Sequence, residues 1–199
     1  MNATKKKILE ASLRLFNAHG VAEVSLRNIA EAIPISIGNL QYHFRKREEI
    51  IEALYHQLVE RIDAVFVPEG EDLLAAALQV PVLLFQAFSD YPFFFIDFVG
   101  ITRNHPKIKK HYADLSKRRK QEFLAVINQL VEKGILRKEE LVGEYHSLYQ
   151  RIELISNFWF SAQLIQREQI PSTAAADYAQ QIKMCMYPYL IGEAKSFLP

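Results

Sequence analysis

The stretch SLRNIAEAIPISIGNLQYHF, residues Ser25–Phe44, has the pattern of two short helices joined by a tight turn. Ser25 can cap the first helix and Ser36 the second, because a serine hydroxyl accepts hydrogen bonds from N–H groups of the first turn. Pro34 disfavours helical dihedral angles at Ile33, so the first helix is expected to end near residue 32. The second helix is polar, with aromatic residues at its end. This pattern predicts a helix-turn-helix whose second helix enters the major groove of DNA.

Basic charge gathers around this motif. Residues 1–47 hold eight Lys/Arg and three acids, a net charge of +5, whereas residues 48–199 hold 16 Lys/Arg and 20 acids, a net charge of −4. Because phosphates attract local positive charge, the N-terminal end is the expected DNA-binding end. A second basic run between Lys107 and Lys120 lies on one amphipathic helix and is interpreted as a solvated face.

The composition favours a helical protein in a reducing compartment. Half of the 199 residues are apolar and seven are glycine, which fits a sizeable all-helical core. One cysteine excludes an intramolecular disulfide framework and favours the cytoplasm, and the charged N-terminus has no secretory signal pattern. The longest apolar tract, residues 80–101, is interrupted by prolines and aspartates, so no membrane span is predicted.

Helical periodicity predicts nine helices. The first runs over residues 4–19, with Thr4 as its cap and Gly20 in a left-handed conformation after it. The fourth begins near Arg47 and ends at Pro68 and Gly70. Loop signals that separate the other helices lie at residues 90–92, 104–106, 133–134 and 170–172. The predicted fold is all-α, with a three-helix DNA-binding head at residues 1–47 and a helical bundle for effector binding and dimerisation at residues 48–199.

Over roughly residues 4–60 the chain resembles the TetR family of bacterial transcriptional regulators. The matching residues are Ile8, Phe16, Gly20, Ser25-Leu26-Arg27-Asn28-Ile29-Ala30, Ser36, Gly38, Leu40, Tyr42-His43-Phe44 and Arg47-Glu48-Glu49-Ile50. The resemblance implies a homodimeric regulator, more often a repressor, that leaves a palindromic operator in double-stranded DNA when a small-molecule effector binds its body. The chain departs from the family at Pro34, where glycine is usual, and at Ile37, where Lys, Arg or Pro is frequent. Because proline disfavours a positive φ, the turn is expected to close in another conformation.

Carried over position by position, the resemblance also implies the DNA contacts. Base contacts fall on Arg27, Ile37, Asn39 and Gln41. Arginine can pair with guanine and Asn or Gln with adenine, while an isoleucine can touch a thymine methyl group. Phosphate contacts, which position the protein without reading sequence, fall on Ser25, Ser36, Tyr42, His43 and Arg47.

Aromatic residues crowd the middle of the chain. They are compatible with a filled helical core or with an apolar effector cavity, and the resemblance implies the cavity. The candidate pocket residues are Phe85, Phe88, Tyr91, Phe94, Phe95, Asp97, Phe98, Phe123 and Trp159. Few ionisable groups lie in this tract, so the effector is expected to be small and largely apolar. Asp97 leaves room for a neutral or cationic molecule with one polar end.

Two apolar stripes near the C-terminus have a spacing that suits packing between subunits or within one chain. The resemblance favours the first possibility, a homodimer. The candidate interface residues are Ile152, Ile155, Trp159, Tyr178, Ile182, Cys185 and Tyr189.

No enzyme class is indicated. The chain lacks the GxGxxG, Walker A, GxSxG and HExxH motifs, and its histidines have no metal-ligand spacing with the cysteine, so no metal or cofactor is predicted. The alternative function is a helical protein-interaction module whose degenerate helix-turn-helix no longer binds DNA. Measuring whether the chain shifts promoter DNA in a salt-dependent way would distinguish these two functions.

Overall fold

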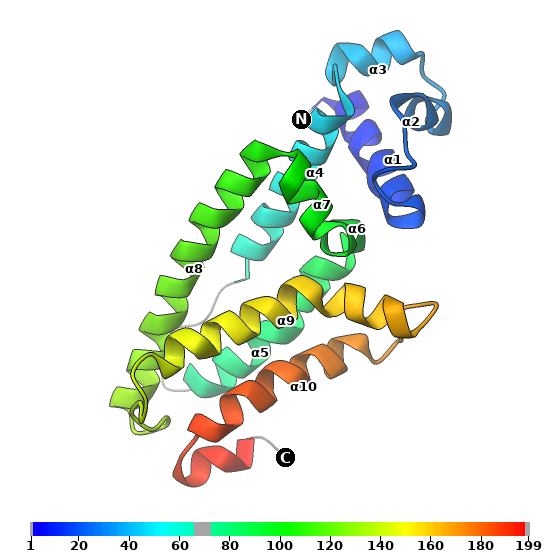
Figure 1. Ribbon diagram of the computed structural model, residues 1–199. Coiled ribbons are helices and arrows are strands. Elements are labelled where there is room, and N and C mark those ends of the chain that lie inside the picture. The colour runs from blue at the N-terminus through cyan, green and yellow to red at the C-terminus, as the bar shows by residue number, and fades with distance from the viewer. Residues whose placement is uncertain (1, 66–72, 198–199) are drawn as a thin grey trace. The chain divides into compact units, whose positions relative to one another are not determined.

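The computed structural model describes residues 2–65 and 73–197, which form ten α-helices and two 3₁₀ helices (Figure 1). The elements are α1 (Ala3–His19), α2 (Leu26–Ala32), α3 (Ile37–His43), α4 (Arg47–Asp63), α5 (Leu73–Ser89), α6 (Pro92–Ile96), α7 (Phe98–Asn104), α8 (Pro106–Glu132), α9 (Glu144–Gln166), α10 (Ala174–Met186), η1 (Tyr187–Tyr189) and η2 (Gly192–Phe197). The all-α prediction is confirmed. The described chain has one α-helix more than predicted because the segment after Tyr91 breaks at Asp97, a break that no proline or glycine announces.

The helices belong to two compact units. Unit 1 comprises Met1–Ala64 and Ala87–Lys109, and unit 2 comprises Val65–Gln86 and Lys110–Pro199. Helices α5 and α8 each run from one unit into the other. The expected domain boundary after residue 47 therefore falls inside unit 1, whose helix α4 continues to Asp63. The predicted end of that helix at Pro68 and Gly70 lies outside the described residues.

Local capping defines the ends of α1. The side chain of Asn2 accepts a hydrogen bond from the Thr4 N–H at 2.9 Å, so the prediction that Thr4 caps this helix is wrong. The helix begins one residue earlier than expected, which leaves Thr4 in its first turn. Gly20 donates its N–H to the Phe16 carbonyl at 2.9 Å. Its φ of +79° is positive, as expected, but its ψ of 162° lies outside the left-handed helical region that was predicted.

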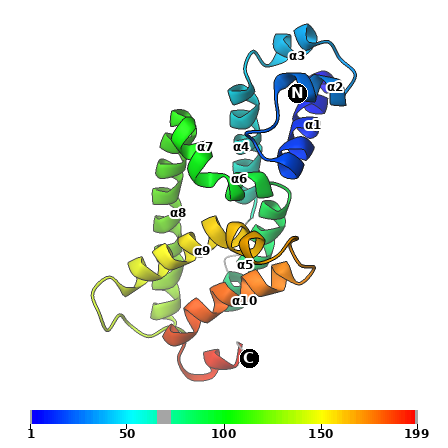
Figure 2. The same ribbon diagram turned by 45° about the vertical axis from the view of Figure 1, so that its right-hand side comes forward.

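The centre of unit 1 is filled by one residue or more from each of its first four helices. Phe16 of α1, Ile29 of α2, Leu40 of α3, and Ile50 and Leu54 of α4 are completely buried. Helix α1 packs against α2 and α4, and α2 packs against α3 (Figure 2). The helix-turn-helix is therefore held on a common apolar core rather than by its own turn.

The turn between α2 and α3 closes differently from the prediction. Pro34 has a φ of +21°, so the expectation that it would avoid a positive φ is wrong. The Ala30 carbonyl accepts hydrogen bonds from the N–H groups of Ile33 and Ile35, and these contacts fix a turn that the pyrrolidine ring disfavours.

Three consecutive phenylalanines of α6 are all buried, each against a different helix. Phe93 packs against Phe16 of α1, with ring centroids 5.5 Å apart. Phe94 stacks on Tyr55 of α4 at 5.3 Å, and Phe95 lies 4.6 Å from Phe88 of α5. Helix α6 therefore packs against α1, α4 and the end of α5 within unit 1.

Unit 2 is built on the antiparallel pair α9 and α10, which lie side by side in both views (Figures 1 and 2). Its core also contains α5 and α8. The buried members of this core are Leu73, Leu74, Leu78, Ile127, Leu130, Leu136, Tyr145, Leu148, Met186, Tyr189 and Leu190. None of the helices in residues 2–65 and 73–197 combines the length and apolar character that a bilayer span requires.

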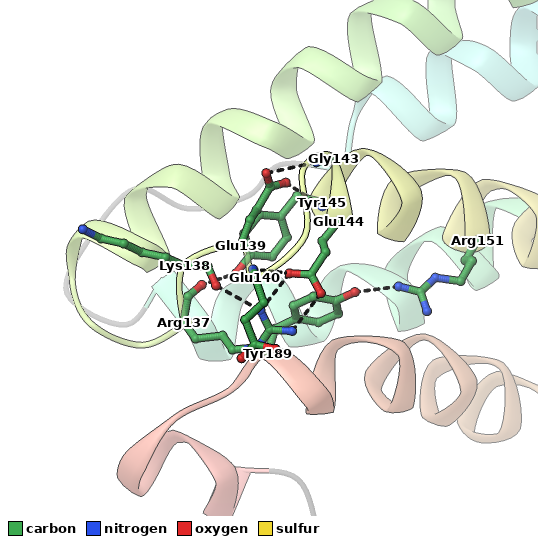
Figure 3. A network of polar contacts seen from close by, with 9 residues as sticks. All are labelled: Arg137, Lys138, Glu139, Glu140, Gly143, Glu144, Tyr145, Arg151 and Tyr189. Carbon is green, nitrogen blue, oxygen red and sulfur yellow. Dashed lines mark hydrogen bonds and ion pairs between the residues drawn. The ribbon is translucent and has the colours of Figure 1, made fainter.

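A polar clasp joins the loop before α9 to the segment after α10 (Figure 3). The Arg137 guanidinium donates to both carboxylate oxygens of Glu144, at 2.8 and 3.0 Å, and lies over the ring of Tyr189. The hydroxyl of Tyr189 in turn accepts a hydrogen bond from Arg151 at 2.7 Å. The hydrogen bonds from Arg137 hold the pKa of Glu144 at about 2, so the carboxylate stays charged at neutral pH.

Candidate functional site

The helix-turn-helix is shaped by its two serine caps. The Ser25 hydroxyl accepts a hydrogen bond from the Asn28 N–H at 3.2 Å, and the Asn28 side chain accepts one from the Ser25 N–H at 2.9 Å. The Ser36 hydroxyl accepts from the Asn39 N–H at 3.1 Å. Both predicted caps are confirmed.

Helix α3 separates into an anchored face and an open face. Leu40 is completely buried, whereas Asn39 and Gln41 are exposed. Ile37 lies at the edge of the helix with 43 % of its surface exposed, and Tyr42 projects into solvent with 85 % exposed. A Cβ atom added at Gly38 would meet no atom of the chain within 4 Å, so the outer face of the helix is open there as well. The structure thus brings the three candidate base-reading residues of α3 onto accessible positions.

The other candidate contacts are arranged less uniformly. Arg27 is exposed on α2, where its Nε lies 2.9 Å from a carboxylate oxygen of Glu31 one turn later. His43 is half-buried beside the ring of Tyr42, with centroids 5.2 Å apart. An exposed i, i+4 ion pair contributes little stability, so Arg27 can exchange Glu31 for another partner at small cost.

Arg47 is turned into the protein. Its Nη1 donates to the carbonyls of Val21 and Val24 at 3.0 and 3.1 Å, and to that of Ala22 at 3.4 Å. These carbonyls belong to the connection between α1 and α2. Sequence reasoning placed Arg47 among the phosphate contacts, and its position after α3 gave no signal of this inward role.

Further polar contacts within unit 1 connect α1 to the segment before α7. The Asn17 side chain donates to the Asp90 carbonyl at 2.9 Å and accepts from the Phe93 N–H at 3.3 Å. Asp97, a candidate for the effector site, accepts a hydrogen bond from the Val21 N–H at 3.3 Å. Its carboxylate therefore contacts the connection between α1 and α2.

The candidate pocket residues divide between the two units. Six of them lie in unit 1: Phe88, Tyr91, Phe94, Phe95, Asp97 and Phe98. The other three lie in unit 2, where Phe85 packs against Trp159 and Phe160, and Phe123 packs against Tyr149. Phe160 was not among the predicted pocket residues, although it stacks on Phe85.

The two stripes expected at a subunit interface contribute to the interior of unit 2. Trp159, Tyr178, Ile182 and Tyr189 are buried within the chain, and Ile152, Ile155 and Cys185 are half-buried. Tyr178 packs against Phe85 and Trp159, so these stripes serve the packing of α5, α9 and α10. The exposed apolar side chains lie on other faces of the same helices. They are Leu154, Phe158 and Ile165 on α9 and Met184 on α10.

The chain is similar to known bacterial regulators along almost its whole length. Residues 8–54 match a family described as bacterial regulatory proteins of the TetR family, and residues 57–197 match one described as bacterial transcriptional repressors. A curated relative, the probable HTH-type transcriptional regulator ArpR of Pseudomonas putida, is 34 % identical over 88 residues, which span 44 % of this chain and 42 % of ArpR.

Solved structures share the fold. A TetR-family regulator from Marinobacter aquaeolei superposes with a TM-score of 0.81 at 22 % identity, covering 100 % of this chain and 96 % of that one. The protein SmeT, solved in complex with triclosan, gives a TM-score of 0.66 at 14 % identity and covers 97 % and 94 % of the two chains.

Proposed function

Because the chain belongs to the TetR family of bacterial transcriptional regulators, we propose that it is a repressor that a small, largely apolar molecule releases from a palindromic operator. The observation that carries the DNA-binding part is the open face of α3. There Asn39 and Gln41 are exposed while Leu40 anchors the helix to the core. A recognition helix needs this division, because its polar face must reach base edges without losing its packing.

Base reading is assigned to Arg27, Ile37, Asn39 and Gln41. Gln41 and Asn39 offer the paired donor and acceptor that adenine requires, and Arg27 can pair with guanine after leaving Glu31. Ser25, Ser36, Tyr42 and His43 are assigned to phosphates. We assign Arg47 instead to positioning the α1–α2 connection, since its guanidinium already donates to three carbonyls.

The proposed regulation acts through α6. Its phenylalanines pack on α1 and α4, and Asn17 and Val21 make hydrogen bonds with the segment that contains it. A displacement of α6 would therefore move α1, on which α2 packs. SmeT, a neighbour in fold, has been solved with triclosan, a precedent that supports a small-molecule effector here.

The proposed dimer uses the exposed apolar residues of the last two long helices. Leu154, Phe158 and Ile165 repeat at a spacing that puts them on one face of α9, and Met184 is exposed on α10. A second copy of the chain would remove this surface from water. It would also supply the second α3 that a palindromic site requires, about 34–36 Å from the first.

The test is selection of DNA from a random-sequence library by the purified full-length chain. The expected result is an enriched inverted repeat that binds with a steep salt dependence, because phosphate contacts release counterions. Recovery of no enriched sequence, together with no salt-dependent binding, would contradict the proposal and favour the protein-interaction alternative.

A further inference from the structure

The corner between α7 and α8, residues 104–107, holds a buried histidine inside unit 1. His105 has 7 % of its surface exposed, whereas the other five histidines of the chain are exposed or half-buried. Its N–H donates to the Ile101 carbonyl at 2.9 Å, and its carbonyl accepts from the Lys109 N–H at 3.0 Å. His105 is therefore held by the end of α7 and the start of α8, and it is the histidine whose protonation would put a charge into the interior.

The α7–α8 corner is tied to α4 by charged groups. The Lys107 ammonium lies 3.4 Å from a carboxylate oxygen of Glu52. Glu48 lies one turn earlier on the same face of α4, since residues four apart in a helix are neighbours. Both carboxylates act on the His105 ring and favour its protonated form, whereas Arg47 at the start of α4 opposes that form. A proton on His105 would therefore change the balance of charge between the corner and α4.

Burial keeps His105 neutral at neutral pH. It lowers the pKa of the ring from the ordinary value of 6.5, and this effect outweighs the attraction of Glu48 and Glu52. An imidazolium in the closed corner would lose its hydration, whereas a corner that exposes the ring restores it. Below pH 6.5 the open corner therefore gains on the closed one, by up to about tenfold for each pH unit, until the pH reaches the pKa of the buried ring.

We propose that the α7–α8 corner is a proton-operated contact, in which mild acid protonates His105, the corner opens from α4, and operator binding weakens. The link to DNA follows from α4 itself. This helix follows α3 after residues 44–46, and Arg47 at its start donates to the α1–α2 connection. The effect on DNA rests on the proposed function, whereas the opening of the corner does not. Acid would thus be a second input to the regulator, separate from a small-molecule effector.

The first experiment measures the opening by NMR on the full-length protein, with the His105 signals assigned through the backbone. The ring of His105 should titrate below its ordinary pKa of 6.5. Between pH 7.5 and 5.0 the protection of the His105 and Lys109 amides, corrected for the intrinsic exchange rate, should fall by about fivefold or more. In Glu48→Gln the fall should move to lower pH, because a carboxylate that favours the protonated ring is gone. The exposed control Glu23→Gln should behave like the wild type.

The second experiment measures operator affinity in His105→Gln and in the wild type at each pH. Because both chains keep His43, its protonation cancels in the ratio of the two affinities. That ratio should rise in favour of His105→Gln by about fivefold or more between pH 7.5 and 5.0, since glutamine takes up no proton. His146→Gln, which removes an exposed histidine of unit 2, should show a ratio that does not change with pH.

Three results would overturn the inference: a His105 ring that titrates at or above 6.5, amide protection with the same pH dependence in His105→Gln as in the wild type, or an affinity ratio that stays constant with pH. The wild-type titration and Glu48→Gln decide the question even if His105→Gln does not fold. An absence of specific DNA binding at pH 7.5 would refute the proposed function, while amide exchange still tests the opening of the corner.

Discussion

Helices α3 and α9 present their side chains in opposite ways. Helix α3 buries Leu40 and keeps Asn39 and Gln41 exposed, whereas α9 buries Trp159 and Phe160 in the body. The contacts that shape α3 join neighbours, such as the Ser36 cap on Asn39, three residues away. Those of α9 reach 38 to 45 residues along the chain, to Tyr189 and Tyr112. Changes on the outer face of α3 should therefore alter DNA binding, whereas changes on the inner faces of α9 should first alter stability.

The largest loss of stability is expected from a substitution in the core of unit 2. Trp159→Ala removes a buried ring that packs on Phe85, Phe160 and Tyr178, and should lower the free energy of unfolding by about 3–5 kcal/mol. Chemical denaturation monitored by circular dichroism measures this loss. A variant as stable as the wild type would contradict this packing role of Trp159.

A substitution of Arg47 tests whether an inward-pointing residue of the DNA-binding head affects stability, as the buried residues of unit 2 do. Arg47→Ala leaves three carbonyls of the α1–α2 connection without their charged donor, and should lower the free energy of unfolding by about 1.5–3 kcal/mol. The salt dependence of DNA binding should stay unchanged. A phosphate contact would instead reduce the salt slope by about one and leave stability intact. Lys46→Ala, whose side chain makes no capping hydrogen bond, is the control.

On the outer face of α3, Gln41→Ala should cost about 1–3 kcal/mol in binding to the selected operator and relax its preference at one base pair. The melting temperature should not change, since Gln41 is exposed. Fluorescence anisotropy with the operator and with single-base variants measures both effects. Arg14→Ala on the exposed side of α1 should bind like the wild type. An unchanged base preference in Gln41→Ala would remove this residue from the reading surface.

Substitutions of the exposed apolar residues of α9 should weaken the proposed dimer and should not destabilise the fold as Trp159→Ala does. Leu154 has 59 % of its surface exposed, so Leu154→Glu should leave the fold intact and place a charge in the proposed dimer interface. We expect the dissociation constant of the dimer to rise at least tenfold, which corresponds to about 1.4 kcal/mol. Analytical ultracentrifugation measures this, with the exposed α8 substitution Gln129→Glu as control. A wild-type chain that sediments as a monomer at micromolar concentration contradicts the dimer.

The smallest change in stability is expected from a substitution in the polar clasp around Arg137 and Glu144. The pKa of Glu144 lies at about 2, below its ordinary value of 4.5, because Arg137 donates to its carboxylate. The clasp therefore stabilises the fold above the unfolded pKa, and this contribution is lost as the pH falls from about 4.5 toward 2. The melting temperature of Glu144→Gln should lie below that of the wild type at neutral pH, and the difference should close toward pH 2. A difference that is constant with pH would exclude the ion pair as its cause.

Sequence reasoning was most accurate where the deciding contacts are local. Ser25 and Ser36 cap their helices as predicted, and the helix-turn-helix has its expected bounds because caps and periodicity act within a few residues. The sequence was less informative for unit 2. The apolar stripes that contain Trp159 in α9 and Tyr178 in α10 have a spacing that fits packing within the chain or between chains. An apolar stripe does not predict which helix it packs against, because that depends on how helices far apart in the sequence come together.

The all-α class, the helix-turn-helix, the basic N-terminal end and the polar residues of its second helix could all be predicted from the sequence alone. Each of these follows from interactions between residues a few positions apart or from summed charge. The inward direction of Arg47 and the contact between Asp97 and the α1–α2 connection became evident only from the folded chain. Those outcomes depend on contacts that cross 23 to 76 residues, and a chain can make such contacts only after its helices have packed.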